Sequence, residues 1–226
     1  MISVINGIRK VDDSYLFKIG DYTMYTREQI MKAVEDNGYK YFHDTKDKNY
    51  DVNIIGIRNM ETEDRVTNRF DDKLTISYKV DGEWCFEVFN CTTDPGDDWV
   101  ENILNKKGVA ILKPGQYRGS HKLRLHAGKY LALGQKKDVT VYRDRNKDGK
   151  YDFDESTCDT GLFGINIHRA TGRTGKTSTY VDKWSAGCQV IASNDDWHCF
   201  LDICQSAREI HGNSFSYTLL KSTDIV

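Results

Sequence analysis

A histidine and a cysteine separated by a polar loop are the residues of this 226-residue chain best suited to chemistry. His168 ends the apolar run 164–168, and Cys188 follows a glycine twenty residues later. A thiolate is a strong nucleophile, and a neighbouring imidazole can serve as its base. The pair therefore predicts nucleophilic catalysis. The alternative is structural, with a buried cysteine behind a glycine and a histidine whose hydrogen bonds are satisfied.

The residues around the pair favour the catalytic interpretation. In a strand, the two isoleucines of the run 164–168 face one way and His168 faces the other. The small residues 185–187 leave room beside Cys188 for a substrate carbonyl and let backbone amides face its oxygen. The loop 169–183 is rich in Gly, Thr, Ser, Arg and Lys. We expect its positive charges and the imidazole to lower the pKa of the Cys188 thiol.

Composition limits the class of protein. Hydrophobic residues make up 38% of the chain, its mean hydropathy is -0.63, and its net charge is -2. A nearly neutral chain does not predict a nucleic-acid partner, which usually requires a basic excess. No apolar run is long enough to span a membrane. The N-terminus lacks the pattern of a signal peptide, which predicts synthesis in the cytoplasm with reduced thiols.

Periodicity predicts a mainly β protein of the α+β class. Residues 1–50 form a small N-terminal extension, in which Thr26 and Gln29 fit a capping box and Gly38 ends the helix. From residue 51 to 226 we expect one domain built as a β-sandwich or barrel, because short alternating segments recur about every ten residues. A C-terminal helix is predicted between Ser193 and Gly212.

An acidic stretch, residues 144–155, fits the twelve-residue pattern of a calcium loop. Gly149 occupies the sharp turn, and oxygen ligands occur at every required position. A β-strand precedes the loop, so we do not expect the helix pair of a full EF-hand. The alternative is a solvated hairpin tip without metal. We predict a structural Ca²⁺ bound by the side chains of Asp144, Asn146, Asp148, Asp152 and Glu155 and by the carbonyl of Lys150.

These motifs together resemble the catalytic domain of L,D-transpeptidases, the YkuD-type domains. Ile167-His168 is similar to the family's strand histidine, and residues 185–188 are similar to its Ser/Thr-His-Gly-Cys motif. Upstream, residues 89–94 and 113–117 resemble the family's Ser-Thr-Gly-like turn and Thr-Pro-x-Gly-x-Tyr segment. The resemblance covers about residues 74–192. Ala186 replaces the motif histidine, and Gln189-Val190 replaces an aliphatic–Arg pair.

The resemblance implies a YkuD-like fold and cleavage or cross-linking of peptidoglycan stem peptides. Cys188 would attack a carbonyl at an L-to-D centre and form a thioester, which an amine or water then resolves. No cofactor is implied for this catalysis. In the implied site His168 is the general base, Ser185 and Gly187 shape the oxyanion pocket, and Arg169, Arg173 and Trp184 contact the substrate.

The implied substrate lies outside the cytoplasm. A chain made without a signal peptide is therefore expected to reach the cell wall after lysis, by injection, or as part of a phage particle, with lysis or particle proteins as partners. The alternative function is a non-enzymatic, calcium-stabilised β module, such as a phage particle component or a cell-wall-binding component.

Overall fold

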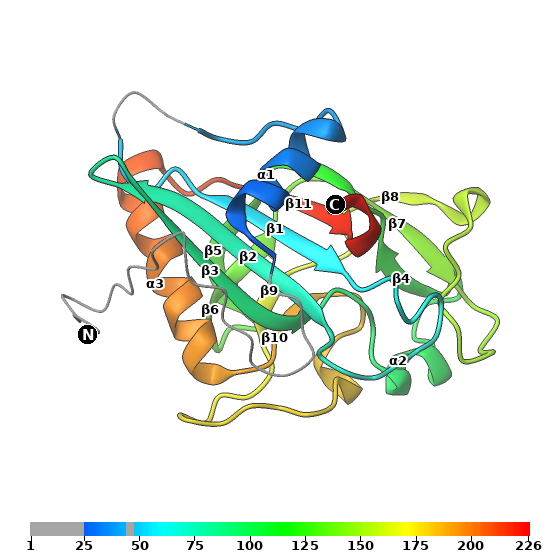
Figure 1. Cartoon of the computed structure of the whole chain (residues 1–226). Helices are drawn as coiled ribbons and strands as arrows, with labels where there is room; N and C mark the ends of the chain where they lie inside the picture. The colour runs from blue at the N-terminus through cyan, green and yellow to red at the C-terminus, as the bar shows by residue number, and fades with distance from the viewer. Residues whose placement is uncertain (1–24, 44–47) are drawn as a thin grey trace.

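The computed structural model describes residues 25–43 and 48–226 (Figure 1). Eight strands close into a barrel in the order β1-β11-β5-β6-β9-β10-β3-β2. These strands are β1 Asn53–Arg58, β2 Asp72–Val80, β3 Glu83–Thr92, β5 Gly115–His126, β6 Tyr130–Gln135, β9 Ile167–Arg169, β10 Gln189–Ile191 and β11 Phe215–Lys221. The predicted mainly β architecture is confirmed, and within it the sheet is a barrel.

A second, three-stranded sheet stands beside the barrel in the order β4-β7-β8. Its strands are β4 Val109–Leu112, β7 Val139–Asp144 and β8 Asp159–Gly161. The helices of the described residues are α1 Arg27–Asp36, α2 Asp97–Glu101 and α3 Asn194–His211, with 3-10 turns η1 Glu155–Thr157, η2 Asp182–Trp184 and η3 Ser222–Asp224.

The β2–β3 hairpin shows how local sequence sets the register. Asp81 and Gly82 both take positive φ, 51° and 85°, as a tight two-residue turn requires. The turn pairs Val80 with Glu83, and the ladder continues to Asp72 opposite Cys91. This long hairpin places the exit of β3 next to β10.

The main core lies between the barrel strands and α3. Trp197, Phe200 and Cys204 of α3 are buried in the same cluster as Leu74 and Ile191 of the barrel. The helix forms as predicted, because the Ser193 side chain accepts from the Asp196 amide at its start and Gly212 follows its last residue.

The opposite face of β1 and β11 is covered by α1. Thr26 and Gln29 form the predicted capping box. The apolar side of the helix, with Ile30 and Val34, packs on Ile55 and Leu220 and neighbouring side chains in a second cluster. The described part of the 1–50 extension is thus packed on the barrel, whereas its residues 1–24 and 44–47 lie outside the described ranges.

The strand predicted over 164–168 is shorter in the structure. β9 begins at Ile167, and Gly164 has a φ of 76°, which is not an extended conformation. The Gln135 side-chain oxygen accepts from the amides of Phe163 (3.1 Å) and Ile165 (2.9 Å). A side chain thus takes the place of a ladder partner for the backbone just before β9.

Within the described ranges, no helix has the length and apolar character needed to cross a membrane.

Gly56 is a point where the barrel interior leaves no room for a side chain. A Cβ on Gly56 would lie 1.9 Å from the Tyr217 hydroxyl. Gly56→Ala should lower the free energy of unfolding by about 2–3 kcal/mol, because the ring must shift and leave its hydrogen bond to Gln189. Urea denaturation measures the change. Gly115→Ala is the matched control, since its Cβ would meet nothing closer than 3.7 Å. Equal costs for both substitutions would contradict this account.

Candidate active site

His168 lies in β9, and Cys188 directly precedes β10, the parallel neighbour of β9. Val190 lies opposite His168, and the Gln189 amide donates to the Asn166 carbonyl at 2.9 Å. Side chains alternate along each strand, so Cys188 and His168 both point away from the core, which contains Ile167. Continued by one residue, the register places Cys188 opposite Asn166 and therefore diagonal to His168.

A tight turn presents Cys188. The Ser185 hydroxyl donates to the Cys188 carbonyl (2.8 Å) and accepts from the Gly187 amide (3.1 Å). Gly187 has a φ of 118°, and a Cβ there would lie 2.1 Å from the Ala110 carbonyl oxygen of β4. Ser185 and Gly187 therefore hold the turn that presents Cys188, and the Gly187 amide is bonded to the Ser185 hydroxyl, not open to another oxygen.

The Cys188 thiol is neutral in this arrangement. It is half-buried and donates to the Gly164 carbonyl at 3.3 Å. Burial raises the pKa of Cys188 to about 11, although a hydrogen bond from the Asn166 backbone opposes the shift. The expectation of a lowered pKa is wrong, because burial outweighs the basic loop. Arg169 is the basic residue of this loop that directly follows His168. Its guanidinium carbon lies over the Tyr130 ring, 4.3 Å from the ring centroid.

A backbone carbonyl orients His168. The ring is 4% exposed, and its Nδ1 lies 2.8 Å from the Arg169 carbonyl oxygen and 3.3 Å from the Tyr130 hydroxyl. Burial lowers the pKa of His168 to about 4; the Arg169 carbonyl raises it and nearby His126 lowers it further. The imidazole is therefore neutral at pH 7. A proton on Nδ1, donated to the carbonyl, leaves the lone pair on Nε2 to act as a base.

Two residues of the site were not assigned a role from the sequence. His126 stacks on His168 with ring centroids 4.4 Å apart, and Tyr130 reaches its Nδ1. In the β5–β6 hairpin, His126 pairs with Tyr130. The hairpin register and the stacked rings show that His126 shares a face with His168.

The three predicted substrate residues lie in different surroundings. Arg169 is next to His168 and stacks on Tyr130. Trp184 ends η2 directly before Ser185 and is 45% exposed. Arg173 lies on an exposed turn that is held to the start of α3 by the Gly175 amide and the Asp195 carboxylate, 3.1 Å apart. Arg169 adjoins His168 and Trp184 precedes Ser185 in the chain, whereas Arg173 belongs to the loop tip.

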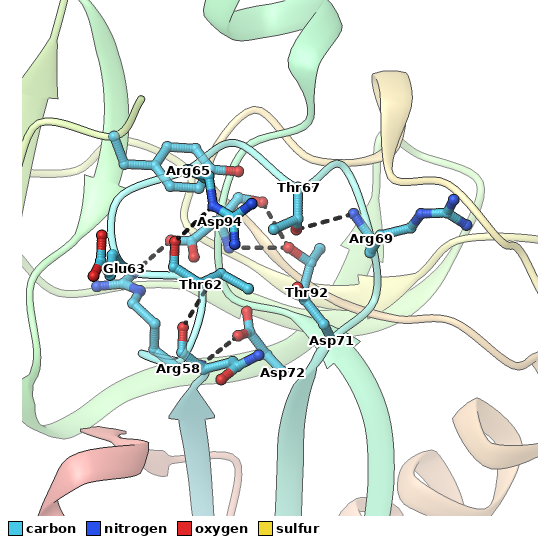
Figure 2. A pocket seen from close by; sticks show the side chains of 12 residues that line it. Arg58, Thr62, Glu63, Arg65, Thr67, Arg69, Asp71, Asp72, Thr92 and Asp94 are labelled. Atoms are coloured by element: carbon cyan, nitrogen blue, oxygen red, sulfur yellow. Dashed lines mark hydrogen bonds and ion pairs between the residues drawn. The ribbon is translucent and has the colours of Figure 1, made fainter. Parts of the chain in front are cut away.

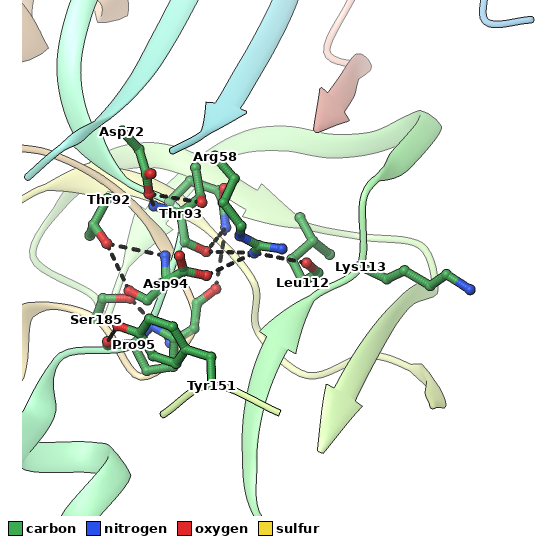
Figure 3. Close-up of polar contacts among 12 residues, drawn as sticks. Arg58, Asp72, Thr92, Thr93, Asp94, Pro95, Leu112, Lys113, Tyr151 and Ser185 are labelled. Carbon is green, nitrogen blue, oxygen red and sulfur yellow. Dashed lines mark hydrogen bonds and ion pairs between the residues drawn. The ribbon is translucent and has the colours of Figure 1, made fainter. Parts of the chain in front are cut away.

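A buried ionic network stands behind this turn (Figure 3). Arg58 of β1 is 2% exposed, pairs with Asp94 at 2.8 Å and donates to the Leu112 carbonyl at 2.9 Å. Asp72 accepts from the Thr93 amide (2.6 Å) and hydroxyl (2.9 Å). Burial raises the pKa of Asp72 to about 7, and the charge of Asp94 adds to the effect.

The network reaches the nucleophile's turn through the backbone. The Gly96 amide donates to the Ser185 carbonyl (2.9 Å), and the Gln189 side chain donates to the Thr93 carbonyl (3.3 Å). A polar pocket opens beside the network (Figure 2). Its lining does not include Cys188 or His168; it is formed by Arg58, Asn59, Thr62, Glu63, Arg65, Thr67, Arg69, Asp71, Asp72, Thr92, Asp94 and Tyr151.

The side chains of the predicted calcium ligands do not all point into the loop. Asp144 is buried at the end of β7, and the Asn146 side-chain amide donates to the carboxylates of Asp148 (3.1 Å) and Asp152 (3.2 Å). Glu155 instead pairs with Lys113, outside the loop. As predicted, no helix pair flanks the loop, which runs from β7 to η1.

A separate acidic group lies elsewhere. Among the described residues, the His, Cys, Asp and Glu groups whose ligand atoms all lie within 4.8 Å of one another comprise Asp97, Asp98 and Asp182. Exposed acidic groups of this kind occur commonly without an ion.

Comparison of the chain with protein family models, with curated proteins and with solved structures finds no match.

Alkylation of Cys188 should report its protonation state. With a pKa of about 11, the thiolate fraction, and hence the iodoacetamide rate, should rise about tenfold per pH unit from pH 7 to 10. Mass spectrometry of the digested protein follows each cysteine separately. Exposed Cys199 provides the comparison for access and should react faster than Cys188 at pH 7. A Cys188 rate that levels off below pH 9 would contradict the raised pKa.

Proposed function

We propose that this protein processes peptidoglycan stem peptides with Cys188 as nucleophile and His168 as base, as an L,D-peptidase or L,D-transpeptidase of YkuD-like type. The observation that carries the proposal is the shared face of β9 and β10, where the Arg169 carbonyl fixes the His168 ring next to the strand that follows Cys188. The motif residues 185–188 form a turn held by hydrogen bonds rather than a random loop.

The chemistry begins from a neutral pair. The pKa values of about 11 for Cys188 and about 4 for His168 exclude a resting thiolate–imidazolium pair. Proton transfer from Sγ to Nε2 must therefore accompany the attack of sulfur on the carbonyl carbon. The imidazolium then protonates the leaving amine as the tetrahedral intermediate collapses to a thioester. An incoming amine or water, deprotonated by the same imidazole, releases the product and restores the thiol.

The position of His168 explains how one residue performs both proton transfers. Its Nδ1 remains bonded to the Arg169 carbonyl, so the ring keeps its orientation in both protonation states. The carbonyl also stabilises the imidazolium that forms during attack, because it is an acceptor for the Nδ1 proton. Arg169, which follows His168 and stacks on Tyr130, suits a substrate carboxylate, and the half-exposed Trp184 suits an apolar substrate group.

A second candidate is the non-enzymatic β module. The neutral thiol bonded to the Gly164 carbonyl, the deeply buried His168 and the absence of the motif histidine at Ala186 favour it. In that case the pair is a packing element, and the acidic loop stabilises the module with calcium. The two candidate functions predict different results when the Cys188 thiol is removed. Only the enzyme would lose product formation on removal of the thiol.

Cys188→Ala should abolish muropeptide processing and leave the fold intact, because the hydrogen bond of the thiol to the Gly164 carbonyl is weak. Mass spectrometry of purified muropeptides, incubated with wild type or variant, measures shortened or cross-linked products, and circular dichroism checks the fold. Cys199→Ala, on the exposed face of α3, is the matched control and should process like wild type. Equal product from wild type and Cys188→Ala would exclude this mechanism, and no product from either would favour the β module.

His126→Ala should shift the acid limb of the pH profile. The base must be neutral, so kcat/KM falls as the pH drops through the pKa of His168, which is about 4 beneath His126. Removing the stacked ring exposes His168 and removes a neighbouring charge, so its pKa rises towards the ordinary 6.5.

At pH 5 the variant should therefore lose roughly fivefold in kcat/KM relative to wild type, and at pH 8 the two should differ little. A purely structural role for His126 would lower activity equally at all pH values, and an unshifted acid limb would refute the assignment.

A further inference from the structure

The end of β7 holds a buried carboxylate without a partner. Asp144 is 1% exposed, and neither of its side-chain oxygens has a hydrogen-bond partner. Burial raises the pKa of Asp144 to about 6, and the charges of Asp152 and Asp148 raise it too. The amides of Asn146 and Asp152 face the carboxylate and oppose the shift, from outside normal hydrogen-bond geometry. A buried acid facing two further acids requires compensating positive charge.

The loop that follows is already folded around this carboxylate. The Asp148 amide donates to the Asn146 side-chain oxygen (3.2 Å), and the Lys150 amide donates to Asp148 (3.0 Å). Lys147 and Gly149 have positive φ values of 58° and 79°, which turn the chain sharply. The Asn146 side-chain amide lies between Asp148 and Asp152 and donates to both carboxylates, so its hydrogens supply partial positive charge between them.

The outer end of the loop is engaged elsewhere. Glu155 pairs with Lys113 and accepts from the Tyr142 hydroxyl at 3.2 Å. The Lys113 ion pair and the hydrogen bonds lower the pKa of Glu155, so it stays ionised in this arrangement. The bidentate ligand that the twelve-residue pattern supplies at its last position is therefore absent, and the loop differs here from an EF-hand loop.

We propose that residues 144–152 bind a calcium ion through the carboxylates of Asp144, Asp148 and Asp152, the side-chain oxygen of Asn146 and the backbone carbonyl of Lys150, without Glu155. These oxygens are hard ligands, and water completes the six to eight positions that Ca²⁺ takes. Half a turn of the Asn146 amide presents its oxygen to the ion. Without the bidentate glutamate, the dissociation constant should be on the order of 10⁻⁴ M.

The site connects to the nucleophile's turn. Tyr151 follows the ligand Lys150, and its hydroxyl donates to the Pro95 carbonyl at 2.7 Å. Gly96, which follows Pro95 in the chain, donates its amide hydrogen to the Ser185 carbonyl. An ion that orders the loop therefore also steadies the segment that supports Ser185. The binding itself does not depend on the catalytic proposal.

The test is a calcium titration of the chelator-treated full chain, read by calorimetry and by the melting temperature Tm. At free Ca²⁺ of about a hundred times the dissociation constant, Tm should rise by roughly 5–10 °C. Asp144→Asn should remove both the heat of binding and the Tm shift. Without calcium this variant should melt no lower than wild type, because a neutral amide replaces a carboxylate that is buried beside like charges.

Two further variants define the ligand set. Glu155→Gln should keep the calcium affinity within about threefold, because Glu155 is bound to Lys113, whereas loss of binding in it would overturn the proposed set. Asp98→Asn belongs to the separate acidic group and should also bind as wild type does. Wild type without any Tm shift, or an Asp144→Asn variant that still binds, would overturn the proposal.

Discussion

The fold depends on neutralising the charge of one guanidinium that is buried away from water. Arg58 lies at the end of β1, and burying its charge unpaired would cost several kcal/mol. The charge is matched by Asp94 and by the carbonyls of Thr93 and Leu112. These acceptors come from the exit of β3 and from β4, so one side chain joins the barrel to the second sheet. Loss of Asp94 would leave the buried Arg58 charge unpaired and lower the free energy of unfolding by about 3–5 kcal/mol.

Polar groups inside the barrel continue this connection to the site. Gln189 is completely buried, where its side chain donates to the Thr93 carbonyl and accepts from the Tyr217 hydroxyl at 2.7 Å. Since Gln189 directly follows Cys188, the depth of β10 in the barrel is fixed by hydrogen bonds to β11 and to the β3 exit. Gln189, where the resembling motif has an aliphatic residue, thus holds β10 in place through its buried hydrogen bonds.

Local signals in the sequence predicted the elements well, because each has its own short-range cause. The capping box at Thr26 and the Ser193 cap both form as expected. The features that the sequence did not predict depend on tertiary contacts. The raised pKa of Cys188 comes from burial, and the placement of His126 comes from a hairpin register that no single segment determines. The truncated β9 has the same origin, since Gln135, thirty residues away in sequence, supplies its missing hydrogen bonds.

The loop between the parallel strands β9 and β10 has a fixed inner part and an exposed tip. Its inner part is fixed, because the Ala170 amide bonds to the Ile191 carbonyl and the Ser178 amide to the Ala192 carbonyl. Its tip, around Arg173 and Gly175, is exposed. Residues at the tip can therefore diverge between related chains, or accept insertions, while the spacing of His168 and Cys188 is conserved by the barrel. The architecture lets the exposed tip change in sequence independently of the backbone that holds His168 and Cys188.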